Sequence, residues 1–171
     1  MTGDDPNDPS TPPNAHRDRP TTQSEYGIPE DEEGLLPWSH VLARLREDRT
    51  FWVATTGPDS RPHTRPVWGV VVDGTFHCGG GERTRWVRNV DADPRLAVHC
   101  ESGEDVVIVE GLAEKLTPEI ADAERLVSID AAYAEKYGIE HGTPVFAIRP
   151  ETVLAWSDYP TDATRWRFED D

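Results

Sequence analysis

Short runs of β-branched and aromatic residues, separated by turn signals, fill the sequence from residue 51 to residue 116, and this pattern constrains the fold more than any other feature. Residues 51–56 end at Gly57-Pro58-Asp59, and residues 63–72 end at Asp73-Gly74, which is a strong signal for a two-residue hairpin. Strands joined by such short turns run antiparallel to their neighbours. The pattern therefore predicts an antiparallel sheet.

The remaining segments add more strands and few helices. Strands are expected over residues 51–56, 63–72, 75–78, 95–101, 106–116, 145–148 and 152–156, with residues 165–168 as a candidate last strand. Helices are expected over residues 38–48, 84–90 and 117–137. Because the helices do not alternate with the strands, a parallel α/β fold is disfavoured, and closure of the sheet would remove its exposed edges. The predicted fold class is mainly β with α, a six- to seven-stranded antiparallel barrel with peripheral helices.

The chain of 171 residues suits one folded domain preceded by a polar tail. Residues 1–34 carry nine acidic residues, two arginines and six prolines, and they contain almost nothing apolar. Burial of so little apolar surface cannot offset the entropy that is lost when a segment becomes ordered. We therefore expect residues 1–34 to be a disordered acidic tail and residues 35–171 to be the folded domain.

The formal net charge of −16 argues against nucleic acid as a partner, because phosphate backbones bind clustered Lys and Arg. No apolar run approaches the length of about 18 residues expected of a membrane span. The N-terminus is acidic, whereas a secretory signal would be basic and then apolar. These features predict a cytoplasmic protein that acts on a small molecule and has neither a nucleic-acid nor a membrane partner.

One stretch of the chain reverses the overall sign of charge. Six of the 17 basic residues lie within residues 61–95, and they are Arg61, Arg65, Arg83, Arg85, Arg88 and Arg95. The same stretch contains Gly79-Gly80-Gly81, directly before the helix expected over residues 84–90. A run of glycines lets backbone N–H groups approach a ligand closely, and a helix N-terminus adds unpaired donors with a positive dipole.

Side chains of the same segment add further groups that bind phosphate. Arg83 and Arg85 carry planar forks of donors, and Thr84 carries a hydroxyl. Residues 79–89 are therefore a candidate phosphate site. The alternative is a flexible loop whose arginines pair with surface acids, and the spacing alone does not decide between the two.

Cys78 and Cys100 lie in apolar, strand-like runs, and each follows a histidine, His77 or His99. Neighbouring residues of a strand point to opposite faces, so neither His-Cys pair can offer both side chains to one metal ion. We therefore expect two buried, reduced cysteines and no metal site.

Several motifs occur in a characteristic order: Phe51-Trp52-Val53-Ala54-Thr55, Arg61-Pro62-His63, Pro66-Val67-Trp68, Thr84-Arg85, Arg88-Asn89-Val90, Asp93-Pro94-Arg95 and Val107-Ile108-Val109-Glu110-Gly111. This ordered set resembles the pyridoxamine 5'-phosphate oxidase-like split β-barrels, in the branch of flavin- and deazaflavin-dependent oxidoreductases. The resemblance covers about residues 37–157. It implies an FMN-binding type of split barrel that forms a homodimer, with FMN or the deazaflavin coenzyme F420 at or near the subunit interface.

The resemblance also implies which residues bind the cofactor. The ring would lie against Pro66, Val67 and Trp68, while Arg65 would point at its pyrimidine edge or pair with an acid. The groups expected at the phosphate are Gly80, Arg83, Thr84 and Arg85, with Asn89 bracing the loop. Many family members have Lys at the position of Trp86, so Arg85 is the candidate that supplies the missing charge.

The function implied by the resemblance is hydride transfer between FMN or F420 and a small organic substrate. The sequence contains no recognisable paired carboxylates, Ser-His-Asp arrangement or activated cysteine, so no catalytic side chain is assigned. The chemistry would then belong to the cofactor. The alternative is a barrel that binds a cofactor or haem without turnover, and the sequence does not distinguish FMN from F420 or haem.

Overall fold

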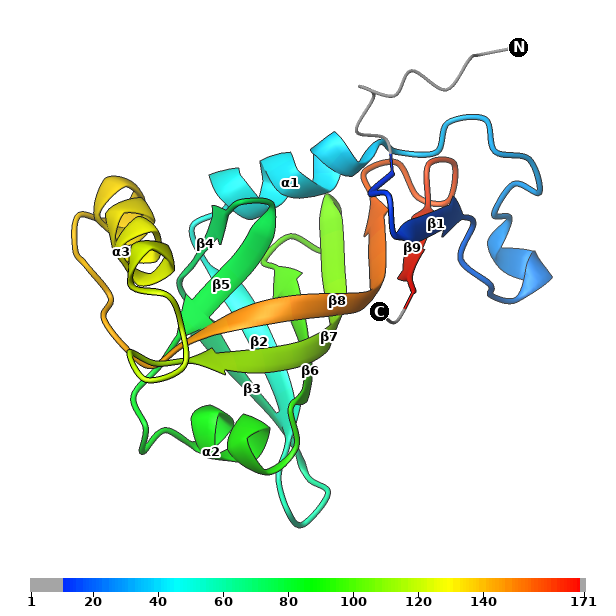
Figure 1. Ribbon diagram of the computed structural model, residues 1–171. Helices are drawn as coiled ribbons and strands as arrows, with labels where there is room; N and C mark the ends of the chain where they lie inside the picture. Colours follow the sequence, from blue (N-terminus) through cyan, green and yellow to red (C-terminus); the bar gives the residue numbers. More distant parts are fainter. Residues whose placement is uncertain (1–10, 170–171) are drawn as a thin grey trace.

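One curved antiparallel sheet dominates the computed structural model, which describes residues 11–169 (Figure 1). The strands of this sheet are β1 (Ala15–Asp18), β2 (Phe51–Thr56), β3 (Pro62–Val67), β4 (Gly69–Val72), β5 (Thr75–Gly79), β6 (Arg95–Cys100), β7 (Val106–Leu116), β8 (Val145–Trp156) and β9 (Thr164–Phe168). The helices are α1 (Trp38–Glu47), α2 (Arg85–Ala92) and α3 (Ala123–Tyr137), with a 3-10 turn at Ser24–Tyr26. The prediction of a mainly β split barrel with peripheral helices is confirmed.

The sheet forks at β8 and does not close. Its main path runs β1-β9-β8-β7-β6-β2-β3, and β5 pairs with the first half of β8 while β9 pairs with the second half. β4 pairs only with β5, so within the described residues no ladder joins β4 to β3. The predicted strand over residues 63–72 is therefore two strands, and the chain leaves the sheet between them at Trp68.

Two other strand predictions differ from the structure. Residues 145–148 and 152–156 belong to one long strand, β8, because Pro150 pairs with Gly111 of β7 at a register shift. A proline lacks the N–H that a regular ladder needs, and an irregular pairing lets the strand continue past it. The hairpin predicted at Asp73-Gly74 is confirmed, since both residues have positive φ angles of 49° and 74° between β4 and β5.

The main core lies inside the curve of the sheet. Alternate residues of the central strands, such as Phe51, Val53, Val98 and Val153, are fully buried there. α1 covers one end of this core through Val41 and Leu45, on the apolar face that the sequence predicts. The opposite end is covered by α2, which packs on β2 and β3 (Figure 1).

A second, smaller core lies between α3 and the outer side of β4, β5 and β8. Ile129 and Tyr133 are the buried residues of α3. The helix is shorter than the predicted span of 117–137, because Asp122 caps it by accepting a hydrogen bond from Glu124 N, and residues 117–121 form a turn instead. Its predicted end at Gly138 is confirmed.

The described part of the N-terminal segment differs from the disorder expected for residues 1–34; residues 1–10 lie outside the described range. β1 pairs with β9 over its whole length, and Arg165 donates to Asp18 at 2.8 and 2.9 Å. The Arg19 guanidinium donates to four backbone carbonyls, those of Asp31, Glu33, Thr161 and Ala163. The order of this segment comes from a strand ladder and charge-assisted hydrogen bonds, whereas composition indicates only how much apolar surface can be buried.

Among the described residues, no helix is long and apolar enough to cross a membrane.

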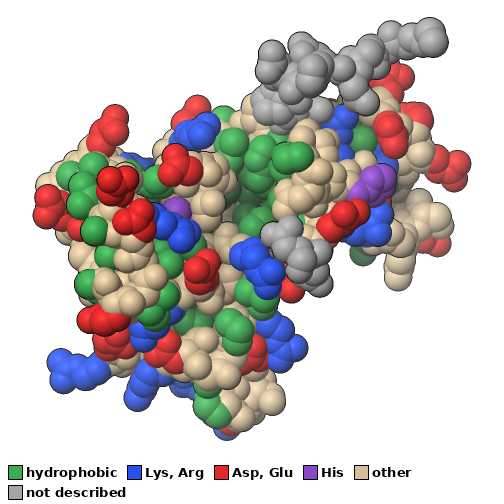
Figure 2. Space-filling model, viewed as in Figure 1, with side chains coloured by type: hydrophobic (Ala, Val, Ile, Leu, Met, Phe, Trp, Pro, Cys, Tyr) green, Lys and Arg blue, Asp and Glu red, His purple; other side chains and the backbone are tan. Residues whose placement is uncertain are grey.

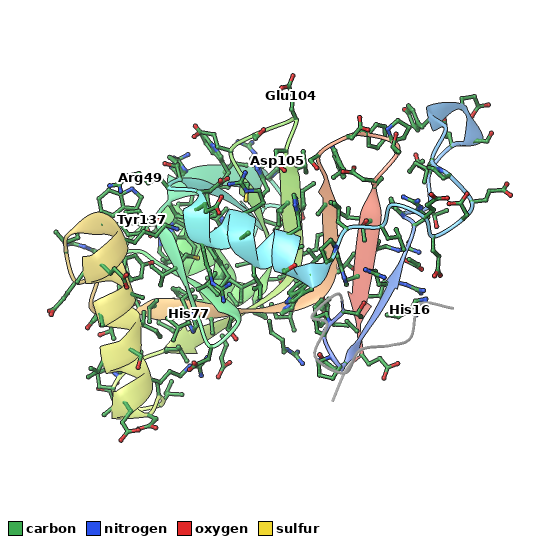
Figure 3. The ribbon with its side chains drawn as sticks, turned by 90° about the horizontal axis from the view of Figure 1, so that it is seen from above. His16, Arg49, His77, Glu104, Asp105 and Tyr137 are labelled. Atoms are coloured by element: carbon green, nitrogen blue, oxygen red, sulfur yellow. The ribbon has the colours of Figure 1, made fainter. Side chains whose placement is uncertain are left out.

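His77 and Cys78 occupy opposite faces of β5, as predicted for neighbours on a strand. Cys78 belongs to the main core, whereas the cross-strand partners of His77, Val70 and Ala147, belong to the smaller core beneath α3. His77 is 1% exposed, and neither ring nitrogen has a hydrogen-bond partner within residues 11–169 (Figure 3). Burial, and next the charge of Arg125, lower the pKa of His77 to about 4.

Since the pKa of His77 lies near 4 in the folded protein and near 6.5 when unfolded, the unfolded state binds more protons between these values. Stability should therefore fall as the pH drops from 6.5 to 4, by up to about 3 kcal/mol from this residue. Urea unfolding at several pH values will measure it. His77→Leu should flatten that part of the profile, and Val127→Leu, an exposed substitution that changes no titrating group, should run parallel to the wild type. Equal slopes for His77→Leu and wild type would contradict this assignment.

Candidate functional site

A cavity of about 530 Å³ opens at the break between β3 and β4. It is lined by Thr50, Pro66, Val67, Trp68, Gly79, Gly80, Trp86 and His141. Pro66 and Val67 end β3, Gly79 ends β5, and Trp86 stands in the first turn of α2. The structure thus brings together four of the residues predicted to bind a cofactor, namely Pro66, Val67, Trp68 and Gly80.

Trp68 forms one aromatic wall of the cavity. It remains 41% exposed, and its indole stacks on the Tyr137 ring with centroids 4.6 Å apart and planes at 5°. Trp68 is one of six large hydrophobic side chains that are exposed among the described residues, and of these six it alone lines the cavity. An offset-parallel ring partner on one side leaves the rest of the indole surface for contact with another flat group.

Gly79 and Gly80 create room for the rings of two other wall residues. A Cβ atom on Gly79 would lie 2.1 Å from His141 Cε1, and a Cβ on Gly80 would lie 2.8 Å from Trp86 Nε1. Both distances are too short for non-bonded atoms. The glycine run therefore serves the aromatic walls directly, whereas the sequence suggested only close approach of the backbone to a phosphate.

Trp86 belongs to the core as well as to the cavity. It is 4% exposed and packs on Phe146 at a centroid distance of 5.3 Å. Trp86 is the residue at which the resemblance leads one to expect a lysine, and the structure places a buried indole there. A buried indole cannot supply that positive charge.

His141 also lines the cavity, and the sequence analysis did not identify it. It lies in the loop between α3 and β8, where a single histidine beside a glycine carries no recognisable motif. The ring packs on Tyr133 at 4.7 Å, and Nδ1 lies 3.2 Å from the Gly142 carbonyl oxygen. Of the eight lining residues, His141 alone has an imidazole side chain, whose ring nitrogens can donate or accept a hydrogen bond.

Arg65 and Arg85 are the chain neighbours of the lining residues Pro66 and Trp86, and the Arg85 guanidinium extends to the β2–β3 turn beside Asp59. The pKa of His63 is lowered by burial, next by the charge of Arg65 and then by the charge of Arg85. The Nε2 atom of His63 is buried and has no hydrogen-bond partner within the described chain. Arg85 also lies 3.9 Å from a carboxylate oxygen of Asp59, at about half exposure.

The remaining predicted site residues stand at or near the N-terminus of α2. Arg83 is exposed and forms no ion pair among residues 11–169, and Thr84 donates its hydroxyl proton to the Gly81 carbonyl at 2.8 Å. Exposed arginines gather at the end of the molecule that carries α2 (Figure 2). Asn89 is buried, and its Nδ2 donates to Thr55 Oγ1 at 3.0 Å, which ties α2 to β2. Arg83, Thr84, Arg85 and Asn89 do not line the cavity itself.

No group of three or more potential metal-ligating side chains occurs in the part of the chain that the structure describes. Cys78 and Cys100 are both free and buried, and burial raises the pKa of the Cys78 thiol to about 12. A thiol held in this neutral form is a poor nucleophile and a poor metal ligand. The chemistry of the site therefore does not come from the cysteines.

Comparison with known proteins identifies a family whose sequence model matches the chain. The sequence model described as pyridoxamine 5'-phosphate oxidase matches residues 38–157. No curated protein matches the sequence. The matched residues 38–157 include every strand from β2 to β8 and all the residues that line the cavity.

Several solved structures are similar to the chain. The conserved hypothetical protein Rv2991 from Mycobacterium tuberculosis has 21% identity and a TM-score of 0.62, over 74% of this chain and 88% of that chain. HutZ, the haem storage protein from Vibrio cholerae, has 16% identity and a TM-score of 0.57, over 68% and 92%. The FAD binding protein from Mycobacterium smegmatis has 19% identity and a TM-score of 0.52, over 78% and 98%. At these identities the similarity concerns the fold alone.

Alanine substitutions in the glycine run will test whether a glycine is needed to leave space for an aromatic ring or only to keep the loop flexible. Gly80→Ala should destabilise the protein by about 1–3 kcal/mol, because the buried Trp86 indole cannot move away from the added methyl group. Gly81→Ala is the matched control, since its Cβ would meet nothing nearer than Thr84 Cγ2 at 3.9 Å. Urea unfolding should show a change below about 0.5 kcal/mol for Gly81→Ala. Equal effects of the two substitutions would contradict this role for Gly80.

Proposed function

Because the chain belongs to the pyridoxamine 5'-phosphate oxidase family, we propose that the cavity beside Trp68 binds the ring of FMN or of the deazaflavin coenzyme F420. The protein would then be an oxidoreductase that transfers hydride to or from a small organic substrate. One observation carries this proposal: an aromatic-walled cavity adjoins the positively charged N-terminus of α2. A phosphorylated, flat, conjugated molecule needs these two environments side by side.

The cavity suits a flat ring system. Trp68 and Trp86 supply aromatic surface, and Pro66 and Val67 supply apolar surface from the end of β3. Sites for small molecules are typically apolar clefts with a few polar groups that fix orientation. Here those polar groups are His141, Thr50 and the backbone of Gly79 and Gly80.

The adjoining end of α2 suits a phosphate. The first N–H groups of a helix lack partners within the helix, and the helix dipole makes this end positive. Thr84, the N-cap residue, makes no side-chain capping hydrogen bond, which leaves these donors available. Arg83 is unpaired within the described chain, and Arg65 and Arg85 both act on His63, whose buried Nε2 lacks a partner. An anion bound at the N-terminus of α2 would offset the positive charges of these arginines and of the helix dipole.

The cofactor, when bound, supplies the hydride chemistry. The residues of the chain bind the ring, orient it and exclude water from one of its faces. Trp68 and Trp86 would exclude water, and His141 would offer a ring nitrogen to a polar edge of the ligand. Both cysteines are free, which supports a reducing compartment such as the cytoplasm.

A second candidate function is haem binding, and the geometry of His141 favours it. Nδ1 faces the Gly142 carbonyl oxygen at 3.2 Å, and a hydrogen bond there would leave Nε2 as the nitrogen with the free lone pair. Histidines that ligate metals commonly hold their other ring nitrogen in this way. HutZ, the haem storage protein from Vibrio cholerae, has a similar fold. In this case the protein would carry a cofactor without turnover.

The outer face of the sheet supports a homodimer. Trp52, His99, Ile108 and Leu154 are successive cross-strand partners from β2 to β8, so their side chains form one row. All four are only partly buried. A mostly apolar row on a sheet face is expected to be covered, and a second copy of the same face would cover it symmetrically.

Purified protein should be titrated separately with FMN, F420 and haemin, using fluorescence for the first two and absorbance for haemin. We expect submillimolar binding of FMN or F420. Arg83→Ala combined with Arg85→Ala should weaken it at least about tenfold, because a charge-assisted hydrogen bond contributes about 1.5–3 kcal/mol. Arg46→Ala, on α1 at the other end of the core, removes an exposed positive charge and should leave affinity unchanged.

Two results would count against this assignment. Binding of haemin alone, with a Soret band that His141→Ala abolishes, would favour the carrier function. Failure of all three ligands to bind the folded wild-type protein would overturn the proposal.

Sedimentation equilibrium will test the dimer. The wild-type protein should have twice the chain mass of 19.1 kDa. Trp52→Glu should shift it to the monomer, because a carboxylate would be buried without a partner in the apolar row. Ile120→Glu, on an exposed turn, is the control and should stay dimeric. A monomeric wild-type protein would refute the proposed interface.

A further inference from the structure

One face of α3 contacts two walls of the cavity. Asp130, Tyr133 and Tyr137 follow one another at helical spacing, and their side chains reach the loops that carry Trp68 and His141. None of the three lines the cavity. These three side chains of α3 therefore affect the cavity indirectly, through their contacts with the segments that carry Trp68 and His141.

The Trp68 wall is held through both its backbone and its ring. Tyr133 Oη donates to the Trp68 carbonyl oxygen at 3.0 Å, and Gly69 N donates to Tyr137 Oη at 3.0 Å. Lys136 Nζ donates to the Gly69 carbonyl oxygen at 2.9 Å. The Trp68-Gly69 peptide groups leave the sheet here, so α3 supplies partners that a neighbouring strand would otherwise supply.

Arg49, which lies just before β2, contacts the Tyr137 ring of the stacked Trp68–Tyr137 pair. The Arg49 guanidinium lies 5.1 Å from the centroid of the Tyr137 ring, and Arg49 Nη1 donates to the Lys136 carbonyl oxygen at 3.0 Å. Figure 3 shows Arg49 and Tyr137 beside each other at the end of α3. A cation against the ring limits the freedom of Tyr137, and through it the freedom of the Trp68 indole.

The His141 wall is held by the same helix one turn earlier. The Tyr133 ring packs on the His141 ring at 4.7 Å and 42°, and Asp130 Oδ1 accepts a hydrogen bond from Gly142 N at 2.9 Å. Tyr133 is fully buried, so it cannot change position without disturbing the smaller core. This one tyrosine contacts Trp68 with its hydroxyl and His141 with its ring.

We propose that Tyr133 and Tyr137 are positioning residues that fix Trp68 and His141 relative to each other, and thereby shape the cavity for a flat conjugated ring. This inference rests on the proposed function and identifies the part of the ligand that the cavity recognises. The ring of the ligand contacts Trp68 and His141, whereas the phosphate lies at α2. Substitutions on α3 therefore change affinity for the ring from outside the cavity.

Three variants of the full chain separate the contacts. Tyr133→Phe removes the hydrogen bond to Trp68 and keeps the ring against His141. Tyr137→Phe keeps the stack with Trp68 and loses the hydroxyl, whereas Tyr137→Leu loses both. Tyr159→Leu is the control, because Tyr159 also pairs with a tryptophan, Trp156, but lies outside the cavity and the face of α3.

The first readout uses the ligand-free protein. The indole ¹H–¹⁵N NMR signal of Trp68 should move in Tyr133→Phe and should move most in Tyr137→Leu, whereas the imidazole signal of His141 should stay in place in Tyr133→Phe because the ring contact is kept. Both should stay in place in Tyr159→Leu. The second readout is the dissociation constant for FMN, F420 or haemin, whichever binds the wild type, together with the melting temperature.

Tyr137→Leu should weaken ligand binding about three- to tenfold, which matches the loss of one aromatic pair. Tyr137→Phe should recover most of this loss, and Tyr133→Phe should weaken binding about fivefold, as expected when one neutral hydrogen bond is lost. Tyr159→Leu should leave affinity unchanged. If Tyr137→Leu does not fold, the two phenylalanine variants still decide the question.

The inference is overturned if folded Tyr133→Phe and Tyr137→Leu leave the Trp68 signal unmoved, or if that signal moves and affinity does not change. Failure of every ligand to bind the wild type would instead count against the proposed function. In that case the NMR signals of the ligand-free variants still test the positioning roles.

Discussion

The structure depends on one constraint, which is that the chain leaves the sheet between β3 and β4 and must satisfy the exposed peptide groups there. A continuous strand over residues 62–72 would pair those groups and bring Trp68 into the ladder. Instead, hydrogen bonds from Tyr133 and Lys136 and to Tyr137 hold the Trp68-Gly69 backbone. The cavity exists because the sheet stays open at this point.

The two sides of the cavity are built by different means. On one side, α3 holds Trp68 and His141 through hydrogen bonds and ring contacts. On the other, Gly80 leaves room for Trp86, which joins the cavity to the main core. Rigid aromatic walls at one end and exposed arginines near α2 at the other provide separate environments for a ring and for an anion. This separation is the physical basis of the proposed cofactor site.

Features that are encoded locally could be predicted from the sequence. The alternation of β2, the turn at Asp73-Gly74 and the end of α3 at Gly138 depend on neighbouring residues, and all three are as predicted. The break at Trp68 was not predicted, although Pro66 and Gly69 interrupt the β pattern of residues 63–72, because the break is held by side chains more than 60 residues away. β1 was not predicted for a related reason, since its order comes from pairing with β9 at the far end of the chain.

The candidate site shows the same division. Pro66, Val67, Trp68 and Gly80 could be named because they belong to motifs, and they line the cavity. His141 could not, because its place depends on the path of a loop and on the ring of Tyr133. The roles of Gly79 and Gly80 also depended on which distant ring each one faces.

The most direct test of the cofactor site is the set of six tryptophan indole signals, followed by NMR as FMN or F420 is added to the wild-type protein. The signals of Trp68 and Trp86 should shift with a common dissociation constant, while those of Trp38 and Trp166, in the core beside α1, should stay in place. Binding that leaves Trp68 and Trp86 unshifted would contradict the central claim that this cavity receives the ring.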